Sequence, residues 1–151
     1  MPMAHDQITY RTLIAVDLPA IAELFEAHTG RPADLDVLGS WIDTFPSAAA
    51  RDNGALVGFL VTCRFAPDVL EIANLHVGPS HRRRGVARRL LGTVAEPASR
   101  MGYRAAIVAS STLNVSLERR VDVRSFYESL GFGVVFETPS TSILAMSLET
   151  G

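Results

Sequence analysis

The chain has 151 residues, of which 48% are hydrophobic and 20% are charged, and its formal net charge is −2. This length and composition are typical of one globular domain, so we expect a single domain over residues 1–151. The nearly balanced charge argues against nucleic acid as a partner, and no apolar run approaches the length of a membrane span. The start of the chain lacks the pattern of a signal peptide, so we expect a cytoplasmic protein.

The single cysteine, Cys63, excludes an internal disulfide and provides no cysteine cluster for a metal. It lies in an apolar run typical of a strand, where we expect a small buried side chain and not a nucleophile. All 14 Lys and Arg residues are arginines, so no lysine is available as a base or nucleophile. We interpret this bias as compositional and typical of a GC-rich bacterium.

Apolar periodicity predicts strands that alternate with helices along the whole chain. In chain order we expect a strand at 8–13, helices at 17–25 and 34–45, a hairpin within 48–63, a strand at 70–77, a helix at 85–100, a strand at 103–109, a helix from 119 or 121 to 130, and strands at 133–136 and 142–148. This order predicts an α/β protein with a mixed sheet flanked by helices.

Four local signals refine these boundaries. Asp17 is the expected N-cap of the first helix, and the Asn53-Gly54 pair predicts the tight turn of the hairpin. Pro97 lies inside the third expected helix, where it predicts a kink or an early end. Gly131 is the expected C-terminal cap of the last helix.

The turn between the expected strand 70–77 and the expected helix 85–100 is the most informative stretch. It contains three consecutive arginines at 82–84, followed by Gly85. A strand, a glycine turn and a helix direct backbone N–H groups and the positive end of a helix dipole at one point. Arginines at a helix N-terminus oppose that dipole unless an anion is bound, so we expect a phosphate or pyrophosphate site here.

Two motifs connect the chain to a known family. The spacing Arg82-x-x-Gly85-x-Ala87 resembles the pyrophosphate loop of the GNAT superfamily of acetyl-CoA-dependent N-acetyltransferases. The segment Ser125-Phe-Tyr127-Glu-Ser-Leu-Gly131-Phe132 resembles the end of a late helix in the same family. The looser resemblance extends from about residue 8 to 148. It implies the GNAT-like acyl-CoA N-acyltransferase fold, with a central splayed mixed β-sheet flanked by about four helices.

The resemblance also implies that acetyl-CoA is the acyl donor and that no metal is needed. Backbone N–H groups from about Arg83 to Arg88 would face the pyrophosphate, and the strand backbone would pair with the pantetheine arm. The expected cofactor-binding residues are Leu75, His76, Val77, Arg82, Arg83, Arg84, Gly85, Val86, Ala87, Arg88 and Tyr127. This pairing requires the sheet to splay after Val77, with backbone groups that the ligand satisfies.

Acyl transfer to an amine needs a group that accepts the amine proton. Glu71 is the first candidate, because some GNAT members use a glutamate six residues before the last residue of this strand. A solvated strand start or an arginine partner explains Glu71 equally well. His76 and Asn74 are second candidates, on the strand face opposite Glu71 unless a bulge re-aims one of them, and a structural role is favoured for His76.

Tyr127 matches the tyrosine that lies near the coenzyme A sulfur in many family members, so we expect it to act as the acid. Core packing is the alternative, because apolar residues recur around it at helical spacing. The chain departs from the family in this helix. Arg120 and Val123 stand where many members have asparagine and alanine, and Asn114 lies too far upstream to replace that asparagine.

These features predict an N-acetyltransferase that acetylates a primary amine of a small molecule by direct transfer in a ternary complex. Acetylation of a protein or peptide N-terminus is one alternative, and a non-catalytic acyl-CoA sensor is another. The expected partners are coenzyme A and the amine, without nucleic acid or membrane, and a homodimer is left open. Segments 28–46 and 113–120 set the acceptor, and Trp41 and Phe45 suit either a pocket or the core.

Overall fold

The computed structural model describes residues 7–111 and 120–148, which form a seven-stranded sheet and four α-helices. The strands are β1 (Ile8–Arg11), β2 (Ser47–Asp52), β3 (Ala55–Ala66), β4 (Val69–Val77), β5 (Ala105–Ser111), β6 (Gly133–Glu137) and β7 (Thr141–Ser147). The helices are α1 (Leu18–Thr29), α2 (Leu35–Thr44), α3 (Val86–Arg100) and α4 (Arg120–Ser129), with short 3-10 turns η2 (Ala15–Asp17) and η3 (Pro79–His81). None of the described helices is long and apolar enough to cross a membrane.

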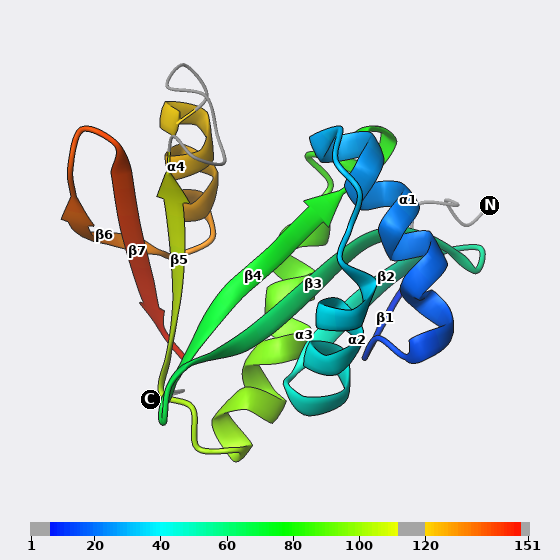
Figure 1. Ribbon diagram of the computed structural model, residues 1–151, viewed down its shortest axis with the longest axis horizontal. Helices are drawn as coiled ribbons and strands as arrows, with labels where there is room; N and C mark the ends of the chain where they lie inside the picture. The colour runs from blue at the N-terminus through cyan, green and yellow to red at the C-terminus, as the bar shows by residue number, and fades with distance from the viewer. Residues whose placement is uncertain (1–6, 112–119, 149–151) are drawn as a thin grey trace.

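The strand order is β1-β2-β3-β4-β5-β7-β6, and the β4–β5 pair is parallel while the other pairs are antiparallel. Figure 1 shows α1 and α2 in front of the β1–β4 half of the sheet and α3 behind it. The mixed sheet flanked by four helices agrees with the fold that the sequence predicts.

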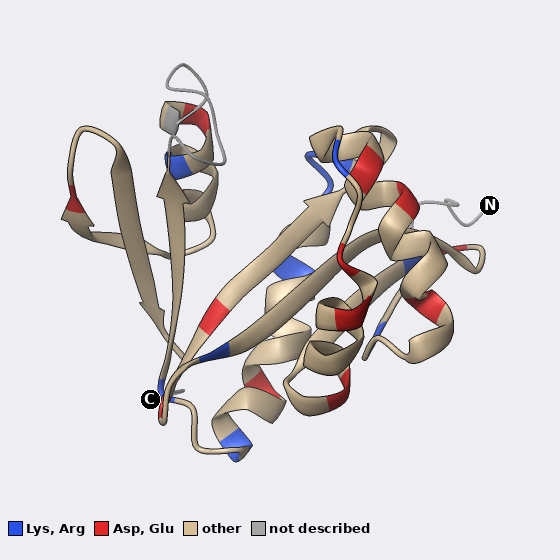
Figure 2. Cartoon of the chain, in the orientation of Figure 1, with Lys and Arg blue, Asp and Glu red and all other residues tan. Residues whose placement is uncertain are grey.

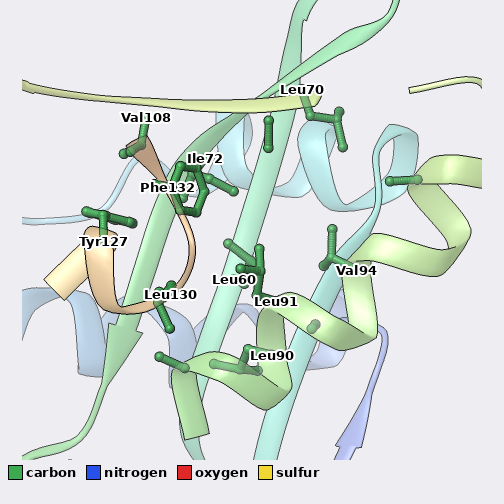
Figure 3. Close-up of a cluster of buried hydrophobic side chains, with 14 of the residues drawn as sticks. Leu60, Leu70, Ile72, Leu90, Leu91, Val94, Val108, Tyr127, Leu130 and Phe132 are labelled. Atoms are coloured by element: carbon green, nitrogen blue, oxygen red, sulfur yellow. The ribbon is translucent and has the colours of Figure 1, made fainter. Parts of the chain in front are cut away.

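Two cores fill the two sides of the sheet. Residues of β3 alternate between them, with Phe59 and Val61 facing α1 and α2 and Leu60 facing α3. Both α3 and α4 contribute to the larger core, in which Leu90 and Tyr127 are among the buried side chains (Figure 3). The continuous apolar run of β3 is therefore that of a strand covered on both faces.

The sheet opens between β4 and β5. Only three residue pairs join these strands, the last of which is Glu71 with Ile107, and beyond that pair the two strands diverge (Figure 1). The expected place of the splay, after Val77, is wrong, because the opening begins six residues earlier. The cause lies next to it: Ala73 is an extra residue in β4, since Val61 pairs with Asn74 and Thr62 pairs with Ile72. Such a bulge bends and twists its strand.

The expected capping role of Asp17 is wrong. The chain already turns at η2, and Asp17 itself has helical angles, so its carboxylate does not cap α1. The carboxylate instead accepts a hydrogen bond from the Ile14 N–H at 2.9 Å and pairs with Arg51 of β2. This ion pair ties the start of α1 to the sheet. The second helix has the regular arrangement, since Asp34 Oδ1 accepts from the Val37 N–H.

The expected early end of α3 at Pro97 is also wrong, because the helix continues to Arg100. Pro97 has no N–H to donate to the Thr93 carbonyl, but it lies in the last turn, and only three helical residues follow it. The amide of Met101 bonds the Pro97 carbonyl, and the amide of Tyr103 bonds the carbonyl of the buried Ala98. The Gly131 cap of α4 is confirmed by its φ of 105° and by the bond from the Phe132 amide to the Tyr127 carbonyl.

A close approach at Gly58 sets the position of α3. A Cβ atom on Gly58 would lie 3.2 Å from the His76 carbonyl oxygen and 3.3 Å from Val86 Cγ1. These distances are tighter than most Cβ contacts, so the neighbours would have to shift by a few tenths of an ångström, and the first of them is backbone that cannot rotate away. The first turn of α3 therefore packs directly against the sheet, which places the preceding loop at the end of β4.

We expect Gly58→Ala to destabilise the fold by about 1–3 kcal/mol, because the added methyl overpacks the contact between β3 and α3. Gly92→Ala is the matched control: Gly92 lies within α3, and a Cβ there meets nothing within 4 Å. That substitution is expected to stabilise the protein by about 0.5–1 kcal/mol through helix propensity. Urea unfolding of both variants measures the difference, and equal stabilities would contradict the close approach.

Candidate functional site

A cavity of about 740 Å³ lies at the opening between β4 and β5. It is lined from both sides of the sheet. The lining residues from α1 and the segment that follows it are Phe25, His28, Thr29 and Arg31. The lining residues from α4 are Asp122, Val123, Phe126 and Tyr127. The open sheet thus connects two compartments, one beneath α1 and one beside α4.

The bulge at Ala73 changes which side chains of β4 share a face. Upstream of the bulge Ile72 packs into the α3 core, and downstream of it Leu75 packs against the same core. His76 lies on the other side, with its ring 5.3 Å from the ring of Phe59 in the α1 core. The exception to the expected opposition of His76 and Glu71 therefore applies, because the bulge adds a single residue that moves His76 to the face of Glu71.

His76 contacts a second histidine across the cavity wall. Its Nδ1 lies 3.0 Å from Nδ1 of His28, and the two ring centroids are 4.4 Å apart. Phe25 packs edge-on against the same imidazole at 5.5 Å. Burial, the neighbouring His28 and the charge of Arg82 lower the pKa of His76 from 6.5 to about 4. His76 is consequently neutral at physiological pH.

Glu71 lies at the apex of the opening. It pairs with Ile107 of β5 and with Cys63 of β3, and its side chain is half-buried. Among the described residues that line the cavity, β4 contributes those from Ile72 to Val77, so Glu71 stands just outside. Asn74, the other candidate, lines the cavity. Burial and the charge of Glu71 raise the pKa of the Cys63 thiol, which is half-buried where we expected full burial.

The arginine-glycine loop has the backbone geometry of an anion site. Gly85 precedes α3 with a φ of 77°, and a Cβ there would point into open space. Arg83 also adopts a left-handed φ of 62°, which is costly for a residue with a side chain. The first N–H groups of α3 have no partner within the helix, and glycine offers no side-chain cap. An anion in front of the loop would satisfy them.

The arginine side chains of this region divide into two groups. Arg82 Nε donates to the Val77 carbonyl at 3.1 Å, and Arg88 donates to the Ser129 carbonyl at 2.6 Å. Arg89 lies over the ring of Tyr10 at 4.7 Å. Arg83 and Arg84 are exposed, and Figure 2 shows the basic stretch between β4 and α3 in blue. All five residues are exposed: Arg83 and Arg84 are placed to neutralise an anion, while Arg82 and Arg88 bond backbone carbonyls and Arg89 lies over an aromatic ring.

A second contact secures the start of the loop. His81 Nε2 lies 2.8 Å from Asp52 Oδ2 at the end of β2, and Ser80 Oγ lies 3.0 Å from His81 Nδ1. The turn η3 is therefore anchored to the β2–β3 hairpin. The loop is held at both ends, by His81 before it and by the packing of α3 after it.

Tyr127 projects from α4 toward the opening. Its ring makes edge contacts with Phe126 at 5.1 Å and Phe132 at 5.5 Å, and only 9% of the residue is exposed. Figure 3 shows it beside Val108 and facing the β4 side of the core. Burial raises the pKa of Tyr127 to about 12, so the hydroxyl keeps its proton at all physiological pH values. The ring packs in the core and the residue lines the cavity, so both interpretations of Tyr127 have structural support.

The structure adds residues that sequence reasoning did not single out as functional. Ser110 lines the cavity, and its Oγ is the buried side-chain polar atom without a hydrogen-bond partner among the described residues. His28 and Asp122 also line the cavity. No spacing pattern signals these residues, because each reaches the cavity from a different element. Trp41, in contrast, packs against the α1 core and does not line the cavity.

The expected contribution of residues 113–119, including Asn114, lies outside the described part of the chain. Arg120 is the first residue of α4, and its side chain is likewise outside the described residues. Val123, in the position where many members have alanine, lines the cavity. Of the expected acceptor segment 28–46, the structure brings His28, Thr29 and Arg31 to the cavity.

A sequence model of the acetyltransferase (GNAT) family matches residues 18–132 of this chain, which confirms the resemblance drawn from the two motifs. No curated protein sequence matches the chain.

Solved structures share the fold at low sequence identity. The putative acetyltransferase yncA of Salmonella typhimurium, solved with its cofactor acetyl-CoA, has a TM-score of 0.75 at 18% identity over 95% of both chains. The ribosomal-protein-S18-alanine N-acetyltransferase of Escherichia coli has a TM-score of 0.73 at 21% identity over 95% of this chain and 96% of that one. The phosphinothricin acetyltransferase of Sinorhizobium meliloti, in complex with acetyl-CoA, has a TM-score of 0.72 at 16% identity over 93% and 88%. These similarities confirm the predicted fold.

The half-buried imidazole of His76 predicts how the stability of the fold depends on pH. Its folded-state pKa of about 4 lies below the 6.5 of an unperturbed imidazole, so the unfolded chain binds more protons between these values. Stability due to this group is complete above pH 6.5 and is lost as the pH falls toward 4, by on the order of 3 kcal/mol. His76→Leu should lack this component when urea unfolding is followed from pH 7 to 4. Parallel pH curves for the two proteins would contradict the shift.

Proposed function

This chain belongs to the acetyltransferase (GNAT) family, and on that premise we propose that it transfers an acetyl group from acetyl-CoA to a primary amine. One observation carries the proposal: Tyr127 and the β4 residues from Ile72 to Val77, which have no β5 partner, line one cavity, and Arg82 of the loop before α3 lines it with them. Acetyl-CoA is named as the bound molecule in two of the structures that share this fold.

The residues present fit coenzyme A in three respects. The β4 backbone from Leu75 to Val77 has no β5 partner, so the pantetheine amides can pair with it as an added strand would. The open space in front of Gly85 admits the pyrophosphate, and the N–H groups at the start of α3 hold it. The exposed guanidinium groups of Arg83 and Arg84 add charge-assisted hydrogen bonds.

Acetyl-CoA supplies the acetyl group as a reactive thioester. The role we assign to Tyr127 is to donate a hydrogen bond from its hydroxyl to the sulfur as the sulfur leaves. The pKa of Tyr127, raised to about 12 by burial, lies well above the roughly 8.5 of a thiol. Complete proton transfer from the phenol to the thiolate is therefore uphill. Tyr127 acts chiefly by stabilising the developing negative charge, which is a task for a buried donor that keeps its proton.

The attacking amine must lose a proton, and two β4 side chains are candidates to accept it. Glu71 stands outside the cavity lining at the apex of the opening, so it would act through a water molecule. His76 and Asn74 line the cavity directly, but an amide has no basicity with which to accept a proton. As the proton acceptor, His76 is favoured by its direct access to the cavity, and Glu71 is favoured by the charge of its carboxylate.

We propose a small-molecule amine as the acceptor. The cavity volume of about 740 Å³ lies within the range of roughly 300–1,000 Å³ that is usual for small-molecule sites. A peptide N-terminus is the second candidate, because a protein of the same fold is named as an alanine N-acetyltransferase of a ribosomal protein. Assays of a small amine such as phosphinothricin beside a peptide that begins with alanine distinguish the two classes.

Coenzyme A is expected to raise the melting temperature of the wild-type protein by mass action. Gly85→Glu should abolish the shift, because a charged side chain would occupy the space in front of the loop. Gly102→Glu is the matched control, since Gly102 also has a positive φ and open space but lies in the turn after α3. The control should be destabilised and still show the shift. Absence of any shift or calorimetric heat with the wild type would exclude the proposed donor.

Tyr127→Phe is expected to lower kcat about 100-fold at saturating amine, because it removes the donor to the leaving sulfur and retains the ring. The coenzyme-induced shift in melting temperature should persist. Tyr103→Phe is the matched control, because Tyr103 is a buried tyrosine whose hydroxyl accepts from Arg64 Nε. Unchanged turnover in Tyr127→Phe would leave this residue with a packing role and would favour a different donor to the sulfur.

A further inference from the structure

We propose that His28 and His76 form a proton relay, in which His76 takes the proton of the attacking amine and His28 receives the charge. The inference rests on the proposed acetyl transfer and identifies its proton acceptor. It assigns to α1 a role that no motif of the sequence indicates.

The contact between the two rings requires a proton on one of the two facing Nδ1 atoms. Their Nδ1 atoms are 3.0 Å apart, a hydrogen-bond distance, so one of them donates and the other accepts. At least one of the two Nδ1 atoms is therefore without a proton. A proton on Nδ1 of His76 has a direct path to Nδ1 of His28.

The second nitrogen of His76 has access to the cavity. Its Nε2 makes no hydrogen bond to the described residues, and His76 lines the cavity. Among the described residues, the buried polar side-chain atom that lacks a partner is Ser110 Oγ, so Nε2 of His76 is not sealed inside the core. Nε2 is thus available to an amine held in the cavity while Nδ1 faces His28.

The charges around the pair favour a cation on His28 and disfavour one on His76. His28 lies in the last turn of α1, where the negative end of the helix dipole stabilises an imidazolium ion. His76 lies between Phe25 and Phe59, with Arg82 on the loop beyond its strand, and burial and these charges disfavour a cation on it. The other charged groups that line the cavity are Arg31, after α1, and Asp122, on α4.

The relay solves the difficulty that a buried His76 is a weak base by itself. The nitrogen of the amine forms its bond to the acetyl carbon, the carbon–sulfur bond breaks, and the sulfur takes the electron pair. The amine proton passes to Nε2 of His76 while the Nδ1 proton of His76 passes to Nδ1 of His28. His76 changes tautomer and stays neutral, and the positive charge appears on His28. The thiolate takes a proton from solvent, and His28 returns one to solvent.

The test uses His28→Asn, whose amide can still accept a hydrogen bond from His76 but cannot accept a proton. With phosphinothricin or the alanine peptide, whichever supports turnover, kcat/KM should fall at least about tenfold near neutral pH. The deficit should shrink at high pH, where hydroxide can accept the proton of the attacking nitrogen in place of the relay. The coenzyme A shift in melting temperature should match the wild type, which separates this result from a failure of donor binding.

Glu26→Gln is the matched control, because Glu26 is exposed on the same turn of α1. It changes the local charge by one unit and should keep the wild-type pH profile. A wild-type profile in His28→Asn would overturn the relay, since a structural hydrogen bond survives that change. A pH-dependent deficit confined to Glu71→Gln would assign the proton to Glu71 and would also overturn the relay.

Nitrogen-15 NMR of the imidazoles gives a readout that needs no amine. The first proton added to the pair as the pH falls should charge the His28 ring, while His76 keeps the shifts of a neutral imidazole. A first proton on His76 would overturn the proposal, even if acetyl transfer is established. Conversely, absence of turnover and of a coenzyme A shift in the wild type would exclude the proposed function without altering the NMR result.

Discussion

The hydrogen bonding between β4 and β5 stops after three residue pairs, and the site depends on that stop. A parallel strand pair that continued would satisfy the β4 backbone and close the sheet. The extra residue Ala73 prevents this, because the bulge turns β4 away from its neighbour. The same residue moves His76 onto the face of α1. One local irregularity thus supplies both an unsatisfied backbone edge and a repositioned imidazole.

The pKa of a tyrosine is raised on one side of the opening, and the pKa of a histidine is lowered on the other side. On the α4 side, burial raises the pKa of Tyr127 and preserves a proton donor where negative charge is expected to develop. On the α1 side, burial together with His28 and Arg82 lowers the pKa of His76 and preserves an unprotonated ring where a proton is expected to leave. Tyr127 thus keeps the proton that a hydrogen-bond donor needs, and His76 keeps the unprotonated ring that a proton acceptor needs.

Much of the fold was predictable because its signals are local. The Asn53-Gly54 turn, the Gly131 cap and the glycine before α3 each force a positive φ that the structure shows. The place of the splay and the face of His76 were not predictable, because a bulge leaves no mark in apolar alternation. Aspartate is a residue type that often caps helices, so Asp17 was expected to be a cap. Its side chain instead pairs with Arg51, which is 34 residues away in the sequence and gives no local signal. His28 was expected only as the first residue of the acceptor segment, and its contact with His76 was missed for the same reason, since 48 residues separate them.

The hydrogen bond from Arg88 to the Ser129 carbonyl has a mechanical consequence. The three pairs between β4 and β5 join two parts of the sheet, β1–β4 and β5–β7. The guanidinium of Arg88 connects the first turn of α3, on the first part, to the last turn of α4, on the second part. Arg88 lies in the first turn of α3, directly after the arginine-glycine loop. Across the opening, this hydrogen bond therefore connects the helix that begins at the candidate anion site with the helix that carries Tyr127.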